Sequence, residues 1–169
     1  EPPPAAAVRS LSGCEFFGQK GVGILRAGEG KDAQAVFMRF GPSLNHGHLD
    51  DLNINWFARG RELTYDLGYS LGSTHTQVGW ARQTASHNVV VVDETSQKPT
   101  GGSLHMFADL PQVKVMEASA EGSYAAQGVS CYRRLVAIIG GDNGQHVVGG
   151  PPVTDGRGVP QARPYVLDI

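Results

Sequence analysis

The chain has 169 residues, a length that suits one domain with its own core, because a domain of this size buries roughly two-thirds of the surface that its unfolded chain exposes. Apolar residues make up 40% and charged residues 18%, and the chain holds 23 glycines and 10 prolines. This composition favours a turn-rich β protein over a helical bundle or a disordered chain. The formal charge of −2 gives no overall attraction for nucleic acid, so we expect no nucleic-acid partner.

The N-terminal stretch Glu1–Ala7 is rich in proline and alanine, which predicts an extended linker because proline fixes φ and removes a backbone donor. We place the linker at residues 1–12 and the folded domain at residues 13–169. The chain does not begin with Met and it stops in Tyr165–Ile169, which resembles the middle of a strand. We therefore expect a segment of a larger protein, truncated at its C-terminus.

No apolar run approaches the ~20 residues that a membrane-spanning helix needs, and the first residues do not resemble a signal peptide. The two cysteines, Cys14 and Cys131, leave two alternatives open. They form a disulfide if the compartment is oxidising, or they are two buried free thiols.

Two segments early in the domain predict an antiparallel hairpin. Val22–Arg26 and Ala35–Phe40 are apolar, and the glycine-rich, charged cluster at 27–32 between them is typical of a turn. Leu52–Ala58 then alternates apolar and polar residues, which predicts a strand that buries Leu52, Ile54 and Trp56. Glu62–Asp66 is expected to return as its partner strand.

The second half of the chain predicts further strands. Residues 67–86 form a long polar connection of the kind that is usually functional. Val89–Val92 is β-branched and predicts a strand buried on both faces. Later strands are expected at Val113–Met116, Cys131–Ile139 and Gln145–Val148. Because no apolar period of 3.6 residues is sustained over ten positions, we predict an all-β fold, a large antiparallel β-sandwich.

Histidines and one aspartate stand beside these predicted strands. His46 and His48 are two positions apart, so on a strand both side chains face the same side. Asp66 ends the predicted partner strand and His87 precedes the valine run. Two imidazoles and a carboxylate are the ingredients of a three-ligand zinc site with an open fourth position. The plain alternative is that each histidine is hydrogen-bonded or faces solvent.

The combined pattern resembles the heparinase II/III-like domain of polysaccharide lyases. It consists of His-x-His-Leu-Asp at 46–50, Arg-Gly-Arg at 59–61, Tyr-Asp-Leu-Gly-Tyr at 65–69 and Arg-x-Thr-x-x-His-Asn-Val-Val-Val-Val-Asp at 82–93. The resemblance is strong over residues 46–97 and weak in the flanking strands. The combination is specific, whereas no single piece of it is.

The resemblance implies a β-sandwich that packs against an N-terminal α/α-toroid domain of the parent chain. It implies Zn²⁺ held by His48, Asp66 and His87, with His46 as a catalytic histidine that faces the sugar. This assignment of His46 differs from a reading in which both neighbouring histidines bind metal. We follow the family, because three ligands and a water already complete a tetrahedral site.

The implied reaction is β-elimination on a uronic-acid-containing polysaccharide such as a heparin- or heparan-type polymer or alginate. The tyrosine that acts as acid or base, and much of the polar group that neutralises the sugar carboxylate, are expected in the toroid, so this segment alone should be inactive. Arg82 is a candidate for binding the anionic substrate, since its guanidinium suits carboxylates, with a structural salt bridge as the alternative. Asn88 is expected to hold the loop at His87 and to contribute to substrate binding. The resemblance further implies a periplasmic or secreted protein.

Two other functions compete. The sequence His46-x-His48-x-Asp50 also begins the binuclear zinc motif of metallo-β-lactamase-like hydrolases, with His105, Asp142 and His146 as further ligands. That family requires His where Asp51 stands, and helices that this sequence does not offer. The other possibility is a noncatalytic carbohydrate-binding sandwich. Its sugar platforms would be exposed aromatic side chains at Tyr69, Trp80 and Tyr124.

Overall fold

The computed structural model describes residues 13–42, 47–68, 74–140, 153–154, 160–161 and 165–169. The expected linker at 1–12 and the expected strand Gln145–Val148 lie outside these residues. The strands are β1 (Glu15–Phe17), β2 (Val22–Ala27), β3 (Gln34–Arg39), β4 (Ile54–Ala58), β5 (Arg61–Glu62), β6 (Ser103–Leu110), β7 (Val113–Ser119), β8 (Arg133–Ile139), β9 (Val153–Thr154), β10 (Pro160–Gln161) and β11 (Tyr165–Asp168).

The helical segments are short. In the described residues they are η1 (Gly18–Lys20), η2 (Gly30–Asp32), the π-helical segment η3 (Gln77–Ala81), η4 (Thr84–Ser86) and η5 (Glu121–Gln127). Among the described residues, none of these segments has the length and apolar character required to cross a membrane.

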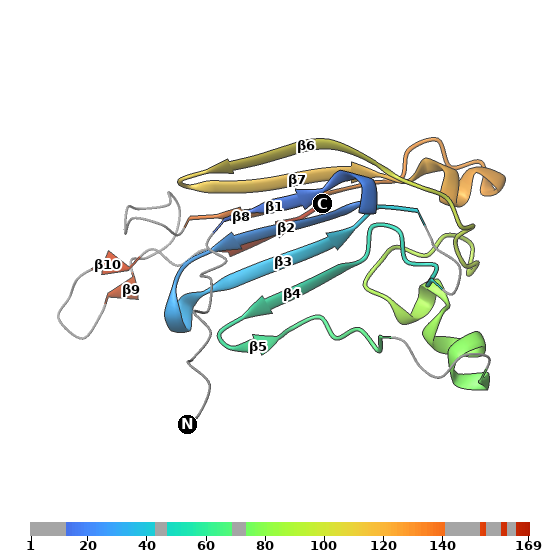
Figure 1. The fold of residues 1–169 in the computed structure, drawn as a ribbon, viewed down its shortest axis with the longest axis horizontal. Helices are drawn as coiled ribbons and strands as arrows, with labels where there is room; N and C mark the ends of the chain where they lie inside the picture. Colours follow the sequence, from blue (N-terminus) through green and yellow to red (C-terminus); the bar gives the residue numbers. More distant parts are fainter. Residues whose placement is uncertain (1–12, 43–46, 69–73, 141–152, 155–159, 162–164) are drawn as a thin grey trace, which may run out of the picture.

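Two antiparallel sheets form the body of the domain, as the sequence predicts. One has five strands in the order β1-β2-β3-β4-β5, and the other has four in the order β11-β8-β7-β6. A two-stranded ribbon of β9 and β10 lies apart from both (Figure 1). The short helical segments η3, η4 and η5 gather at one end of the sheets (Figure 1). That end also carries the loops that follow β3, β5 and η4.

The core lies between the two sheets. Alternate residues of β2 and β3 point inward, and the side chains of Leu25, Val36 and Met38 are fully buried. They belong to one apolar cluster with Met116 of β7 and Val136 and Ile138 of β8. The sheets come close at Gly23, where an added Cβ would lie 2.8 Å from the sulfur of Met116. Burial of apolar area between two patterned sheets therefore holds this region together.

Most expected strands are present, but three predictions near the valine run and the β4–β5 hairpin are wrong in detail. The strand β4 begins at Ile54, because Leu52 has φ of 69°, outside the strand region, although its side chain is buried. The returning strand is confined to β5. Beyond it the Thr64 hydroxyl, rather than a backbone carbonyl, accepts a hydrogen bond from the Trp56 amide at 2.7 Å.

The valine run Val89–Val92 is not a strand buried on both faces. It is a loop in which Val90 is 68% exposed, and its last residue makes an isolated bridge to Thr95. Asp93 has positive φ, so the backbone turns directly after the valines. The Tyr132 hydroxyl donates to the Val90 carbonyl at 2.8 Å, which replaces the hydrogen bond that a neighbouring strand would supply.

Cys14 and Cys131 are free thiols, with Cys14 partly buried and Cys131 exposed. The disulfide alternative is therefore wrong in this structure, and so is the expectation that both thiols are buried. Burial raises the pKa of Cys14.

Candidate metal centre

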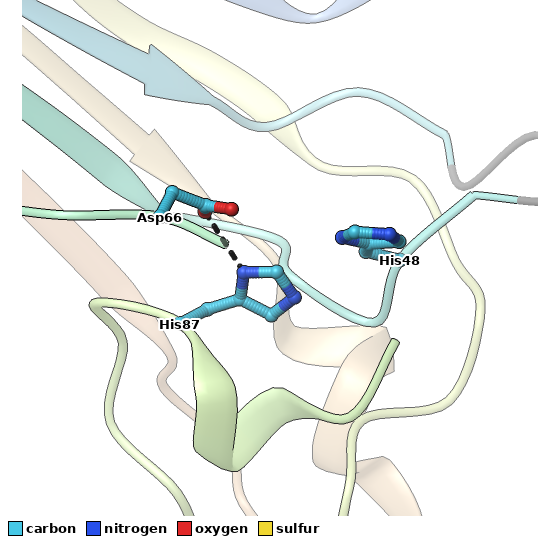
Figure 2. Close-up of side chains that lie close together, drawn as sticks. All are labelled: His48, Asp66 and His87. Atoms are coloured by element: carbon cyan, nitrogen blue, oxygen red, sulfur yellow. Dashed lines mark hydrogen bonds and ion pairs between the residues drawn. The ribbon is translucent and has the colours of Figure 1, made fainter. Parts of the chain in front are cut away.

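Three loops at one end of the sandwich each supply one side chain that could bind a metal ion. His48 lies in the connection between β3 and β4, Asp66 follows β5, and His87 directly follows η4. The candidate ligand atoms of these three residues all lie within 4.8 Å of one another (Figure 2). The structure thus brings together the three residues that the sequence predicts as zinc ligands. His48 lies in a loop rather than on a strand, which corrects the expectation from residue spacing.

Asp66 is held by hydrogen bonds to both of its carboxylate oxygens. One oxygen is 2.9 Å from Nδ1 of His87 and accepts from the Asn53 amide at 2.8 Å, and the other accepts from the Gly68 backbone amide at 2.8 Å. The hydrogen bond from His87 is the main reason why the pKa of Asp66 falls to about 2. Asp66 therefore remains a carboxylate, the form that binds metal ions, at any pH near neutrality.

His87 presents a ring nitrogen to the centre of the cluster. In the neutral tautomer whose Nδ1 donates to the Asp66 carboxylate, Nε2 carries the lone pair. Nε2 is buried and has no hydrogen-bond partner among the described residues. A buried acceptor without a partner is costly in a folded protein, and a bound metal ion would satisfy it.

His48 completes the donor set. Its ring centroid is 5.0 Å from that of His87, and Figure 2 shows the His87 ring between Asp66 and His48. Burial lowers the pKa of His48, and the nearby His87 lowers it further, so the neutral imidazole that binds metal is favoured. Two imidazole nitrogens and one carboxylate oxygen fit Zn²⁺ with one position left for water.

The other predicted site residues, His46, Arg82 and Asn88, are not members of the triad. His46 lies outside the described residues. Arg82 is partly buried, and its Nε has no partner among the described residues, while its carbonyl accepts from the Leu49 amide at 3.0 Å. Asn88 donates its backbone amide to the Asn53 side chain at 3.0 Å and its side-chain amide to the Tyr65 carbonyl at 3.3 Å.

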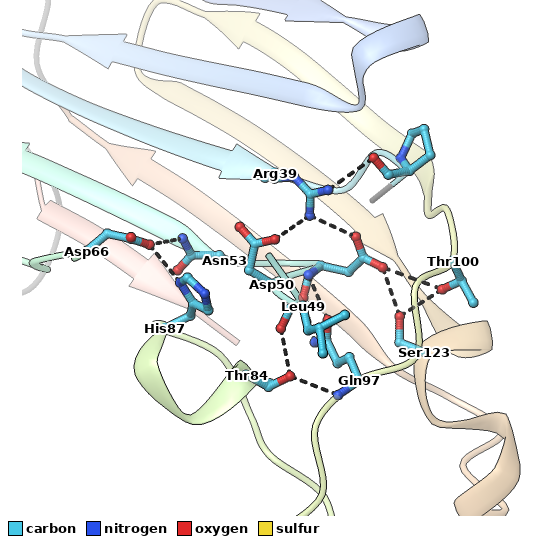
Figure 3. Close-up of polar contacts among 12 residues, drawn as sticks. Arg39, Leu49, Asp50, Asn53, Asp66, Thr84, His87, Gln97, Thr100 and Ser123 are labelled. Atoms are coloured by element: carbon cyan, nitrogen blue, oxygen red, sulfur yellow. Dashed lines mark hydrogen bonds and ion pairs between the residues drawn. The ribbon is translucent and has the colours of Figure 1, made fainter. Parts of the chain in front are cut away.

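A network of buried polar residues beside the triad was not predicted from the sequence. Asp51 is 2% exposed, and its carboxylate accepts from Arg39 at 3.1 Å and from the Ser123 hydroxyl at 3.0 Å (Figure 3). Arg39 also donates to Asp50 at 2.6 Å. Burial raises the pKa of Asp51, since the guanidinium and hydroxyl donors offset only part of the desolvation. Only the adjacent acidic pair at 50 and 51 signals this network in the sequence.

The residues of the two competing functions are placed differently. His105 lies on β6 and its Nε2 contacts the Ser119 hydroxyl at 2.7 Å, so it is not part of the triad. Asp142 and His146 lie outside the described residues. Trp80 is 51% exposed, as the sugar-platform hypothesis requires.

Tyr124 is fully buried, so it is not a platform for sugar. Its ring packs edge-on against Tyr132 with centroids 5.1 Å apart, and its hydroxyl donates to the Thr95 carbonyl at 2.9 Å. Tyr69, the third proposed platform, lies outside the described residues.

Comparison with known proteins supports one family. Residues 10–149 match the model of the heparinase II/III-like C-terminal domain. An alginate lyase of Stenotrophomonas maltophilia is 32% identical over an alignment of 117 residues that covers 63% of this chain and 16% of that protein. An exo-oligoalginate lyase of Saccharophagus degradans is 32% identical over an alignment of 148 residues that covers 71% of this chain and 19% of that protein. The chain thus spans less than a fifth of the length of these relatives.

Solved structures share the fold. A heparinase III structure matches with a TM-score of 0.60 and 22% identity, covering 76% of this chain and 20% of that chain. A mutant heparan sulfate lyase from Pedobacter heparinus matches with a TM-score of 0.59 and 20% identity, covering 75% of this chain and 20% of that chain. Together with the match over residues 10–149, these findings show that the chain belongs to the heparinase II/III-like family and contains its C-terminal β-sandwich domain.

Proposed function

We propose that this chain is the β-domain of a polysaccharide lyase that cleaves uronic-acid-containing glycans by β-elimination. The observation that carries the proposal is the convergence of His48, Asp66 and His87 within 4.8 Å in a chain of the heparinase II/III-like family. Alginate is the first polymer to test, because the two relatives at 32% identity are named as alginate lyases. Heparin- and heparan-type polymers follow, supported by the fold alone.

In the proposed reaction a base removes the proton next to the uronate carboxylate, and an acid protonates the departing glycosidic oxygen. We assign His46 to the sugar side of the site, as a catalytic residue. His48, Asp66 and His87 would hold Zn²⁺, which supplies a structural cross-link between three loops rather than an activated water. Arg82 is proposed to bind the substrate carboxylate, because a guanidinium can form paired hydrogen bonds with it. Asn88 keeps the loop at His87 in place beside the substrate.

The remaining parts of the enzyme are proposed to lie outside this segment. The solved relatives are about five times as long as the region they share with this chain, since it covers 20% of them. This leaves room for the N-terminal α/α-toroid that would supply the catalytic tyrosine and the rest of the cleft. We also propose a periplasmic or secreted location, where a polymeric substrate is accessible.

The decisive experiment measures the product. Elimination at a uronate leaves a C4–C5 double bond conjugated to the carboxylate, which absorbs in the near-ultraviolet, whereas hydrolysis leaves saturated ends. Full-length protein incubated with alginate, and separately with heparan-type polymers, should generate this absorbance. The variant His46→Ala should keep its zinc and lose most of the activity. Saturated products, or activity on β-lactams or phosphoesters that follows metal content, would replace the lyase by a zinc hydrolase.

Metal content is tested separately. One zinc per chain is expected in the parent protein, and His48→Ala and His87→Ala should each lose it. If both variants hold as much zinc as the parent, the ligand set is wrong. If His46→Ala loses zinc, His46 is a ligand instead of a catalytic residue.

A further inference from the structure

The segment that directly follows His48 has no regular secondary structure, and yet it is held rigidly. The backbone amide and carbonyl of Asp51 both bond to one side chain, that of Gln97, at 2.7 and 2.9 Å (Figure 3). Gln97 is 2% exposed and lies 46 positions away in the sequence. A side-chain amide that accepts from an N–H and donates to the C=O of the same residue acts like one rung of a β-ladder.

The second amide hydrogen of Gln97 is also used. Its Nε2 donates to the Tyr132 hydroxyl at 2.9 Å, and that hydroxyl donates onward to the Val90 carbonyl. Tyr132 stands just before β8, so the amide is anchored next to the four-stranded sheet. All three hydrogen-bonding contacts of the Gln97 side chain are therefore made inside the protein, and the side chain has one orientation available.

Gln97 also connects to the loop that carries His87. Its backbone amide donates to the Thr84 hydroxyl at 2.8 Å, and this hydroxyl donates to the Leu49 carbonyl at 2.7 Å. Thr84 is fully buried, and its own carbonyl accepts from the His87 amide at 3.1 Å. Through one hydroxyl and one amide, the residues next to His48 are joined to the turn that ends at His87.

From these contacts we infer that Gln97 is a positioning residue, which fixes His48 opposite His87 by holding the backbone of Asp51. It does not touch the metal-ligating atoms; it acts through the segment 49–51. The inference rests on the proposed metal centre for its functional meaning, because a metal site requires its ligands at set distances. Outer residues of this kind commonly change metal affinity by about 10- to 100-fold when they are altered.

The test compares Gln97→Met with Ile138→Ala in the full chain. Methionine has a similar size and no hydrogen bonds, whereas Ile138 is buried at the far end of β8 and controls for a general loss of stability. Zinc affinity is measured by competition with a chromophoric chelator, and ligand geometry by the visible spectrum of the cobalt-substituted protein. Gln97→Met should weaken zinc binding by about 10- to 100-fold and alter the cobalt spectrum. Ile138→Ala should lower the melting temperature and leave both readouts as in the parent.

Zinc affinity and a cobalt spectrum in Gln97→Met that equal those of the parent would overturn the inference. If Gln97→Met does not fold, Gln97→Asn serves the same purpose, because its shorter side chain cannot reach both backbone groups of Asp51.

A metal-free measurement separates this inference from the proposed metal centre. Hydrogen exchange of the peptide 47–53, relative to that of β7, should be faster in Gln97→Met than in the parent. If the parent binds no zinc, the metal centre is wrong, and this exchange rate still decides whether Gln97 positions the segment. Equal exchange in the parent and the variant would show that it does not.

Discussion

The two ends of this domain are held together by different interactions. Between the sheets, apolar side chains such as Leu25 and Val136 are fully buried, and no polar partner has to be found for them. At the end that carries the candidate metal triad, the backbone follows irregular loops, and buried polar side chains such as Thr84 and Gln97 satisfy its hydrogen-bonding groups. The apolar region tolerates apolar substitutions that conserve its volume, whereas the polar region works only with particular partners at particular distances. Rigidity without regular secondary structure therefore has to be built from specific side chains.

The largest stability effect is expected between the sheets. Leu25→Ala should lower the free energy of unfolding by about 2–5 kcal/mol, because it leaves a cavity in the fully buried centre. Zinc affinity should remain that of the parent, since Leu25 lies on β2 in the apolar cluster between the sheets, whereas the triad lies in loops at one end of them. Denaturant unfolding and a zinc titration check the two parts. A large loss of zinc affinity in Leu25→Ala would mean that the two regions are one cooperative unit.

Removal of the metal tests how much a bound zinc ion stabilises the end of the domain that carries the candidate triad. A ligand that binds only the folded state stabilises it by about 2.7 kcal/mol when its concentration is 100 times its Kd. Stripping zinc with a chelator should therefore lower the melting temperature of the parent protein. His87→Ala, which lacks one ligand, should show no change on the same treatment. An equal shift in both proteins would place the stabilising metal elsewhere.

Thr84→Val separates hydrogen bonding from shape. The substitution keeps the volume of the side chain and removes the hydroxyl that joins the Leu49 carbonyl to the Gln97 amide. Two buried backbone groups lose their partner, which should cost about 1–3 kcal/mol. Because the lost contacts lie beside the triad, zinc affinity should fall together with stability. Chelator competition and denaturant unfolding provide the two values, and unchanged zinc affinity would contradict the assignment of this hydroxyl to the site.

The smallest effect is expected at Tyr132, and it depends on pH. Burial is the main cause that raises the pKa of Tyr132 to about 12. The folded protein thus keeps the phenol proton at a pH where the unfolded chain has lost it. The resulting stabilisation is complete below the unfolded pKa of about 10 and is lost as pH rises towards 12.

Tyr132→Phe removes this titration together with the hydrogen bonds of the hydroxyl to Gln97 and Val90. We expect the parent to be more stable than the variant by about 1 kcal/mol near neutral pH, with the difference shrinking above pH ~10. Unfolding curves measured from pH 7 to 11 test this. A difference that is constant across this range would show that the hydroxyl does not titrate as described.

The strands and the triad follow from the sequence for different reasons. Alternating apolar residues predict β2, β3, β7 and β8, because sheet burial has a period of two. The candidate metal triad was predicted from a multi-part motif spread over residues 46–93. The strand β6 was harder to predict from the sequence. β6 has few buried positions and a bulge between Leu104 and Met106, so its pattern is weak.

The hydrogen bonds made by the side chains of Gln97, Tyr132 and Arg134 could not be predicted from local sequence pattern. Gln97 is one glutamine in a polar stretch, and its partner Asp51 lies 46 positions away. The valines at 89–92 have strand propensity. Instead of a neighbouring strand, however, the hydroxyl of Tyr132 and the guanidinium of Arg134 donate hydrogen bonds to the carbonyls of Val90 and Asn88. Such contacts depend on tertiary structure, which overrides local propensity.

The contacts of Arg134 indicate when, during folding, the candidate site can form. Its guanidinium donates to the Leu52 carbonyl at 2.9 Å, 82 positions earlier in the chain, and to the Asn88 carbonyl, and it forms a paired contact with Asp168 of β11. During synthesis, the three candidate ligands leave the ribosome before Arg134 does, since they lie between positions 48 and 87. The backbone around them cannot take its final form until β8 has been made and has joined its sheet. Formation of the candidate site is therefore expected only after β8 has been made, well after its three residues have left the ribosome.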